Sequence, residues 1–260
     1  MRATERAFVI GLRNLYNAFN ESRKAAKTRA TLAVTGGSPR AAELAGLLGA
    51  QRSARGAELL LTVSESGDSV TLSGKAVDKT DEISLPSSSG EKLISELAPR
   101  VVGALDEDYL VPLGFAYPAF RRAVCEEVIR KNARQNAVIG ALPVPGADLP
   151  VMTANQARMV LNIAAIHGEE LSLERARELI GVLAAGFGFR ALGRQLVKLV
   201  PVGGWAAAGV IGYAGTLAMG RAAMLYFARG KRQPDEKEMS EIRSRATEEA
   251  KDFVSRMKRR

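Results

Sequence analysis

The stretch "AELLLTVSESGDSVTLSGKAV", residues 57–77, decides the fold class of the first part of the chain. Its two flanks, 57–64 and 68–77, are runs rich in Leu, Val and Thr that favour extended backbone. Between them stands "ESGD", whose small and polar residues suit a tight turn between antiparallel strands. The sequence therefore predicts a β-hairpin at this place.

The segments on either side of the hairpin extend it into a small α/β unit. Upstream, "TLAV" predicts a strand, "TGGS" a turn, and residues 39–50 a helix that begins with Pro39, a first-turn position that accepts proline. Downstream, "SLPSSSGEKLISELAPRVVGAL", residues 84–105, predicts a polar loop followed by a helix. We therefore expect an α/β unit over residues 29–105.

The remainder of the chain has the apolar spacing of helices. Residues 109–230 predict an all-helical domain, and residues 231–260 predict a separate charged helix that starts at Pro234. Residues 1–28 predict a basic amphipathic helix, which either docks on the main body or faces a membrane or partner. The expected fold class is thus α+β, with a small N-terminal α/β unit followed by a larger all-helical domain.

Charge and composition narrow the function classes without choosing among them. The 260 residues carry a formal net charge of +9, which favours polyanionic partners such as nucleic acid, anionic lipid or phosphorylated protein. No recognition motif with interleaved aromatic residues accompanies this charge, so we expect no specific nucleic-acid binding. The N-terminus has no apolar core followed by a cleavage site, so we expect a cytoplasmic protein.

The chain has one cysteine, Cys125, and one histidine, His167. These numbers exclude an intramolecular disulfide and a Cys/His metal cluster. A nucleophile pair of the two residues stays an alternative to a buried thiol and an exposed imidazole at a helix end. We expect no cofactor and no enzymatic activity.

Gly36 and Gly37 follow a predicted strand and precede a predicted helix, which is where α/β proteins cradle phosphate groups. The lysine and hydroxyl of a Walker A loop are missing at the required spacing, as is the third glycine of a Rossmann fingerprint. The string "DKTD", residues 78–81, resembles the N/T-K-x-D motif with which small GTPases read guanine. The alternative function is therefore a nucleotide-binding switch or weak NTPase on a degenerate GTPase-like unit, bound through Gly36, Gly37, Lys79 and Asp81.

Residues 199–220 contain no charged side chain, and a helix of this length would just span a bilayer. Because Pro201, Gly203 and Gly204 interrupt its start, a buried helix within a bundle is the other interpretation. The close approach of a second helix is predicted by three small residues, Gly209, Gly212 and Gly215.

A basic stripe precedes this apolar stretch, because Arg190, Arg194 and Lys198 are spaced by four residues and share one helix face. The stripe would seat against anionic headgroups, with the long side-chain stems along apolar surface. We predict that an anionic membrane surface or a protein partner binds Arg190, Arg194, Lys198 and Trp205.

The stretch "VPGADLPVMTANQ", residues 144–156, predicts a hinge between two helices. Pro145-Gly146 suits a β-turn, and Asp148 is expected to cap that turn. Thr153 is expected to cap the next helix, with Gln156 completing a capping box. The hinge motif consists of Pro145, Gly146, Asp148, Pro150, Thr153 and Gln156.

Residues 109–229 resemble a known family, through "PAFRRAV", "NAVIGALPVPGADLPVMTANQARMVLNIAAIHGEEL", "ARELIGVLAAGFGFRALGRQLVKLVPVGGW" and "GYAGTLAMGRAAMLYF". It is the domain of unknown function shared by YcjF-like inner-membrane proteins and by proteins in which it follows an Era/TrmE-type GTPase domain. The resemblance implies an all-helical module that is often membrane-associated and coupled to a GTPase. It implies no established catalytic activity.

The sequence thus predicts a non-enzymatic helical module near the inner face of a membrane. It would bind a membrane surface or a protein partner, with a GTPase supplied in trans as one such partner. The oligomeric state does not follow from the sequence.

Overall fold

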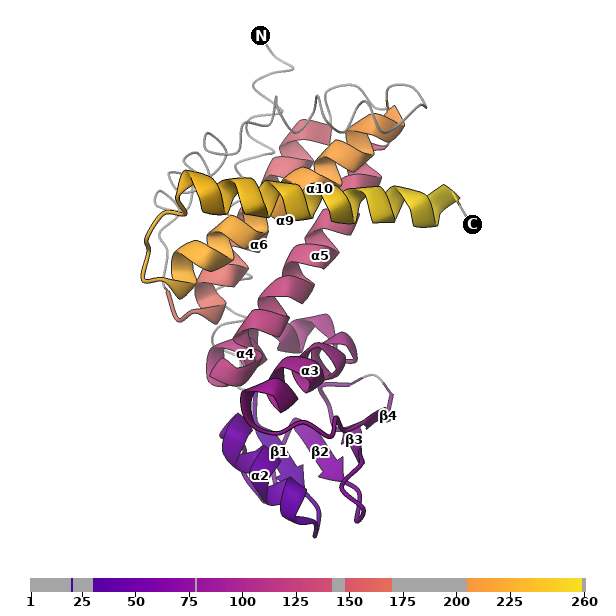
Figure 1. Ribbon diagram of the computed structural model, residues 1–260, viewed down its shortest axis with the longest axis vertical. Helices are drawn as coiled ribbons and strands as arrows, with labels where there is room; N and C mark the ends of the chain where they lie inside the picture. The colour runs from indigo at the N-terminus through magenta and orange to yellow at the C-terminus, as the bar shows by residue number, and fades with distance from the viewer. Residues whose placement is uncertain (1–19, 21–29, 78, 142–147, 170–204, 259–260) are drawn as a thin grey trace. The chain divides into compact units, whose positions relative to one another are not determined.

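The computed structural model describes residues 20, 30–77, 79–141, 148–169 and 205–258 (Figure 1). The chain forms two compact units. We call the first, Arg23–Glu127 with Ala165–Gly168, the α/β unit, and the second, Met1–Ser22 with Val128–Ala164 and Glu169–Arg260, the helical unit. The small mixed sheet in the first and the long helices in the second confirm the predicted α+β class.

The α/β unit is built on a four-stranded sheet in the order β1-β2-β3-β4. The strands are β1 (Leu32–Thr35), β2 (Leu59–Val63), β3 (Ser69–Ser73) and β4 (Asp81–Ser84). β1 and β2 are parallel and are joined by α2 (Pro39–Leu48), whereas the other neighbours are antiparallel. The predicted hairpin, the strand before it and the helix that begins at Pro39 are therefore confirmed.

The sequence pattern did not predict β4. Its residues read DEIS, and every side chain except that of Ile83 is exposed. Main-chain pairing with β3, from Leu72 opposite Asp81 to Ser69 opposite Ser84, forms this strand without a buried side-chain pattern. Acidic side chains on an edge strand also discourage pairing with another chain.

Leucine side chains of neighbouring strands fill the core of the α/β unit. Leu32 lies opposite Leu59, and Leu61 lies opposite Leu72, and all four are buried. Over them, α2 packs against β1 and β2 and also contacts α3 (Gly90–Gly103), the helix predicted after the polar loop.

Two further elements complete the α/β unit, α4 (Glu107–Ala116) and the 3-10 turn η1 (Pro118–Phe120). Asp106 caps α4, because its Oδ1 accepts a hydrogen bond from the amide of Asp108 at 2.9 Å. The Tyr117 hydroxyl accepts a hydrogen bond from the amide of Leu32 at 2.8 Å, which ties the start of β1 to η1.

The helical unit contains α5 (Arg121–Gly140) from Val128 onward, α6 (Asp148–Ile166), α9 (Trp205–Ala228) and α10 (Glu236–Lys258). α9 is its central helix, since every residue from 209 to 220 except Ile211 is buried. α10 lies across α9 (Figure 1) and buries Met239, Ala246 and Ala250. The charged C-terminal segment is thus a helix, as predicted, although it starts at Glu236 and not at Pro234, and its buried apolar residues pack on α9.

The predicted start of α6 is wrong. The helix begins at Asp148, five residues before Thr153, so Thr153 lies within the helix and does not cap it. Pro150 does not prevent this start, because in a first helical turn the N–H that proline lacks would have no intrahelical acceptor.

Several predicted elements lie outside the described residues: the helix over 1–28 apart from Asn20, the helix that carries Arg190, Arg194 and Lys198, and the turn at Pro145 and Gly146. Among the helices that are described, none combines the length and the hydropathy needed to cross a bilayer.

Candidate functional site

The two glycines of the predicted phosphate turn have different surroundings. At Gly36, φ is +128°, and a Cβ would lie 2.6 Å from the carbonyl oxygen of Val63. Close packing against β2 therefore requires glycine at this position, whether or not a ligand binds. A Cβ at Gly37 would meet nothing within 4 Å. The Gly36 carbonyl oxygen accepts a hydrogen bond from Arg52 Nη2 at 2.8 Å.

The structure does not bring the predicted guanine-reading residues to this turn. Asp81 is the first residue of β4 and pairs with Leu72, while Gly36 follows β1 at the opposite edge of the sheet. Three strand spacings, about 14 Å, separate the two edges. Lys79 and Asp81 are both exposed.

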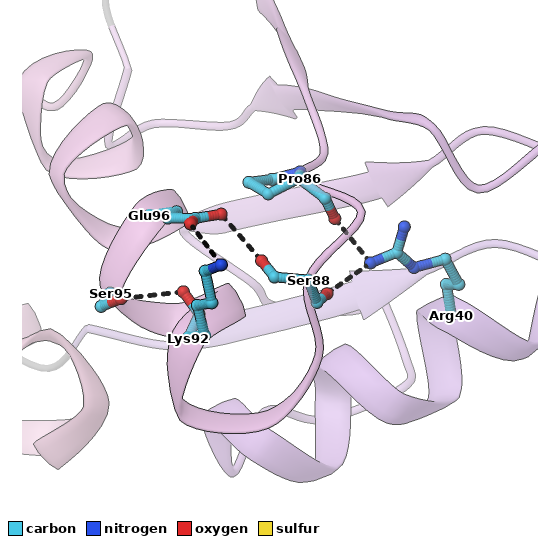
Figure 2. Close-up of polar contacts among 6 residues, drawn as sticks. All are labelled: Arg40, Pro86, Ser88, Lys92, Ser95 and Glu96. Carbon is cyan, nitrogen blue, oxygen red and sulfur yellow. Dashed lines mark hydrogen bonds and ion pairs between the residues drawn. The ribbon is translucent and has the colours of Figure 1, made fainter.

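The serine-rich loop before α3 is fastened to α2 by Arg40 (Figure 2). Arg40 Nη2 donates to the carbonyl oxygens of Pro86 at 2.6 Å and Ser88 at 2.9 Å, and Nη1 donates to that of Gly67 at 3.4 Å. The Ser88 hydroxyl donates to Glu96 at 2.7 Å, and Lys92 lies 4.0 Å from the same carboxylate. The polar groups of this loop thus contact one another and the protein backbone.

The hydroxyl of Ser38, at the N-terminal end of α2, lacks such contacts. Ser38 stands at the N-cap position but makes no capping hydrogen bond. It is only 8% exposed, and its Oγ has no hydrogen-bond partner in the described structure. A buried hydroxyl without a partner is unfavourable.

A buried polar cluster joins three helices of the helical unit. Asn136 of α5 and Thr216 of α9 are fully buried, and Asn136 Nδ2 donates to Thr216 Oγ1 at 2.9 Å. From α6, Asn155 Nδ2 donates to Asn136 Oδ1 at 3.2 Å and Gln156 Nε2 donates to Thr216 Oγ1 at 3.4 Å. Thr216 Oγ1 in turn donates to the carbonyl oxygen of Gly212 at 2.7 Å. Each buried group therefore has a partner.

The predicted role of Gln156 in a capping box is wrong, since its amide points to α9 and the helix starts at Asp148. A capping box does occur at the start of α10. There the Asp235 carboxylate accepts from the Glu238 amide at 2.9 Å, and Glu238 accepts from the Asp235 amide at 3.0 Å. Hydrogen bonds from Arg229 and from this amide hold the pKa of Glu238 below its usual value.

Small residues bring α5 and α9 into backbone contact, as the glycine spacing predicted for Gly209 and Gly212. A Cβ at Gly209 would lie 2.7 Å from the Ala137 carbonyl oxygen, and one at Gly212 would lie 3.0 Å from that of Asn136. A Cβ at Gly220 would lie 2.5 Å from Ile129. As the residue number rises along α9, the residue number of its contact in α5 falls, so the two helices are antiparallel.

An ion pair and a stacked ring pair attach α10 to α9. Arg221 Nη2 lies 2.8 Å from Glu249 Oε1. The rings of Tyr213 and Phe253 stack with their centroids 4.4 Å apart. Burial, and next the charge of Glu249, raise the pKa of Tyr213.

The Cys125 thiol is buried, and this burial raises its pKa to about 12. The prediction of a buried thiol is confirmed. A thiol with this pKa is protonated at neutral pH and is a poor nucleophile.

In the described part of the helical unit two large apolar side chains are exposed, one before and one after the α5–α6 connection in sequence. Val138 of α5 is 64% exposed and Val151 of α6 is 39% exposed. Each shares its helix face with an exposed arginine, Arg134 one turn before Val138 and Arg158 two turns after Val151. We call these four residues, one pair on each helix, the valine–arginine pairs. The sequence does not reveal them, because exposure depends on packing by other helices.

The other predicted binding residues are only partly described. Arg190, Arg194 and Lys198 lie outside the described residues, and Trp205 is the first residue of α9. Asp148 and Pro150 belong to the first turn of α6. Their predicted roles in binding and in the hinge stay predictions.

A family model described as "Domain of unknown function (DUF697)" matches residues 118–252. The match includes the residues of the buried polar cluster, of the α5–α9 contacts and of the valine–arginine pairs. No curated protein matches the chain, and neither does any solved structure.

Proposed function

The chain belongs to the DUF697 family of unknown function, and from this premise we propose that it is a non-enzymatic helical module that binds a membrane surface or a protein partner. The single observation that carries the proposal is the exposure of Val138 and Val151 beside exposed arginines. We propose that these side chains belong to a larger docking surface, because contiguous apolar patches rimmed by polar residues mark interaction sites.

The internal construction of the helical unit supports this proposal. Backbone contact between α5 and α9 and the hydrogen-bonded cluster around Thr216 fix the helices with respect to one another. A well-fixed bundle holds its surface residues in one arrangement, which reduces the conformational entropy lost on binding.

The finer parts of the proposal come from the resemblance to YcjF-like proteins and to GTPase-fused relatives. We propose that the module works at the inner face of a membrane, with a GTPase supplied in trans as its protein partner. Arg190, Arg194, Lys198 and Trp205 would add basic and aromatic groups to the binding surface.

Membrane fractionation of cells that express the full chain tests the proposal, because the chain should sediment with membranes. High salt should release a peripheral protein, since screening weakens attraction to anionic headgroups. Trp205 is the single tryptophan, so its fluorescence should shift to the blue with anionic vesicles. A chain that stays wholly in the soluble fraction and ignores such vesicles at low salt would contradict the membrane part of the proposal.

A second candidate function is a nucleotide-binding switch, favoured by the buried, unsatisfied hydroxyl of Ser38 at the N-terminus of α2. A phosphate oxygen at this helix end would supply an acceptor. Calorimetry with GTP, GDP and ATP in the presence of Mg²⁺ tests it, with Ser38→Ala as the variant expected to weaken binding. Absence of heat at millimolar nucleotide would end this candidate.

A further inference from the structure

We infer that the helical unit has a phosphate-binding site around the Tyr213 hydroxyl, formed by Arg130 and Arg134 of α5 and Arg221 of α9. We call these four residues the arginine–tyrosine cluster. The inference goes beyond the proposed function, because it names a ligand chemistry and the residues that would recognise it, whether the phosphate belongs to a soluble molecule or to a lipid headgroup.

The contact between α5 and α9 places Arg134 level with Tyr213. A Cβ at Gly212 would lie 3.0 Å from the Asn136 carbonyl oxygen. Tyr213 directly follows Gly212, and Arg134 lies two residues from Asn136, so both lie within about 3 Å of this level along the helix axes.

A second contact along the same two helices does the same for Arg221 and Arg130. A Cβ at Gly220 would lie 2.5 Å from Ile129, and each arginine directly follows one of these two residues. The two members on each helix also share a face, because they are four residues apart on α5 and eight residues apart on α9.

The charges around Tyr213 show that these faces lie on the same side of the two helices. Burial, and next the charge of Glu249, raise the pKa of Tyr213, while the three arginines oppose this rise. Because the effect of a charge weakens with distance, the three guanidinium groups lie near the hydroxyl. Three positive charges and one negative charge of the described residues thus act on it.

The Tyr213 hydroxyl is placed to donate a hydrogen bond to a ligand. The residue is only 7% exposed, and its hydroxyl has no hydrogen-bond partner among the described residues. Stacking of the ring on Phe253, with centroids 4.4 Å apart, holds it in place. A buried hydroxyl without a partner is unfavourable, and an anionic oxygen would supply the acceptor. Arg134 is exposed and the Glu249 side chain is 40% exposed, so the cluster reaches solvent.

The local charge selects a phosphate monoester over a carboxylate as the ligand. Glu249 already lies 2.8 Å from Arg221, and the charges that act on the hydroxyl still leave an excess of two positive charges. A phosphate monoester carries about −1.5 to −2 charges at pH 7 and three strong acceptor oxygens, whereas a carboxylate carries one charge. Arginine also matches phosphate well, because its planar fork donates to two oxygens at once.

Calorimetric titration of the full chain with glycerol phosphate tests the inference, at about pH 7.5, where the ester is a dianion. Acetate at the same ionic strength is the carboxylate probe and should bind at least about tenfold more weakly. Arg134→Gln should weaken binding of the ester about tenfold or more, because a hydrogen bond between charged groups is lost. Tyr213→Phe keeps the stacked ring and removes only the hydroxyl, and it should also weaken binding about tenfold.

Matched variants separate this site from general charge and from loss of a hydroxyl elsewhere. Arg232→Gln removes an exposed charge between α9 and α10, and Tyr226→Phe removes a hydroxyl near the other end of α9. Both should bind the ester within about twofold of the unaltered chain, because neither changes the cluster. Circular dichroism melts check that each variant is folded.

One variant should change affinity in the opposite direction. Glu249→Gln removes the carboxylate that competes for Arg221, so the ester should bind about fivefold more tightly. If the cluster served only to attach α10, loss of this ion pair would not improve phosphate binding. Weaker or unchanged binding by this variant would contradict the site.

Vesicles distinguish the two sources of the phosphate group. Phosphatidic acid has a monoester headgroup, so the second probe is vesicles of phosphatidylcholine and phosphatidic acid at about 9:1, against phosphatidylcholine alone. Sedimentation that Arg134→Gln and Tyr213→Phe abolish assigns the phosphate to a lipid, and binding of the soluble ester alone assigns it to a soluble ligand. Either result supports the site. A chain that binds neither probe, that binds acetate as tightly as the ester, or whose folded variants all bind equally overturns it.

Discussion

The two units of this protein secure their polar groups in different ways. In the α/β unit, Arg40 donates mainly to carbonyl oxygens of nearby loops, close to the surface. In the helical unit, Asn136 and Thr216 are bonded to each other from helices eighty residues apart in sequence, with no exposure to solvent. The loop carbonyls that Arg40 binds can still accept hydrogen bonds from water, whereas Asn136 and Thr216 have no access to water. We therefore expect the helical unit to tolerate fewer substitutions.

The largest expected difference between the two units is the effect on stability of replacing a glycine. Gly209→Val places side-chain atoms where the Ala137 carbonyl lies 2.7 Å from a Cβ, so it should destabilise the helical unit by about 3 kcal/mol. Gly46→Ala in α2 meets nothing within 4 Å and should instead stabilise the α/β unit by about 0.5–1 kcal/mol. Urea unfolding followed by circular dichroism measures both. Equal effects of the two substitutions would contradict the contrast.

The next effect tests the buried cluster. Thr216→Val removes the acceptor of two amide donors and should cost about 2 kcal/mol, because the Asn136 amide stays buried without that partner. The double variant Thr216→Val with Asn136→Leu should recover part of this loss, since both polar partners are then gone. Urea midpoints with unchanged m-values give the numbers. A double variant that loses the sum of both single effects would show that the two side chains are not coupled.

A smaller effect is expected from Arg40→Met in the α/β unit. The variant frees the carbonyls of Pro86 and Ser88, and because water reaches this part-buried loop the cost should be about 1 kcal/mol. Hydrogen exchange of the amides at 85–90 should quicken while that of the β2–β3 pairing stays unchanged. Faster exchange throughout the sheet would mean that Arg40 stabilises the whole unit.

The smallest effect concerns pH. Arg229 and the Asp235 amide lower the pKa of Glu238 in the folded protein. A lowered pKa gives stability that is present above the ordinary value of 4.5 and is lost as pH falls through the folded value. The protection factors of the first-turn amides of α10, which correct for the intrinsic slowing of exchange in acid, should therefore fall as pH decreases, and Glu238→Gln should remove this pH dependence. In the α/β unit, the hydroxyls of Ser66 and Ser64 lower the pKa of Asp68 in the same direction.

Local signals in the sequence predicted most of the fold. The "ESGD" turn and its flanks gave β2 and β3, and Pro39 marked the start of α2. The failures came where tertiary contacts decide. β4 forms by pairing with β3, and the start of α6 passes through Pro150, which local rules treated as part of a hinge.

The candidate site was harder to predict for the same reason. The sequence did not single out Thr216, because its partners Asn136 and Gln156 belong to other helices. The phosphate residues were chosen from short strings, and the structure separates Gly36 from Asp81 by the width of the sheet. Glycine is needed at position 36 because a Cβ would clash with the Val63 carbonyl oxygen. A motif search cannot distinguish a glycine required by packing from one required by ligand binding.

The spacing of the α9 glycines also limits how the helical unit can move. Gly212 and Gly220 are eight residues apart, about 12 Å along the axis, and each receives a different residue of α5. A slide of α9 by one turn, about 5.4 Å, would bring Thr216 level with Ile129 and break its bond to Asn136 in the same step. The bundle therefore resists displacement of α9 along its axis, because such a movement would require the core around α9 to unpack.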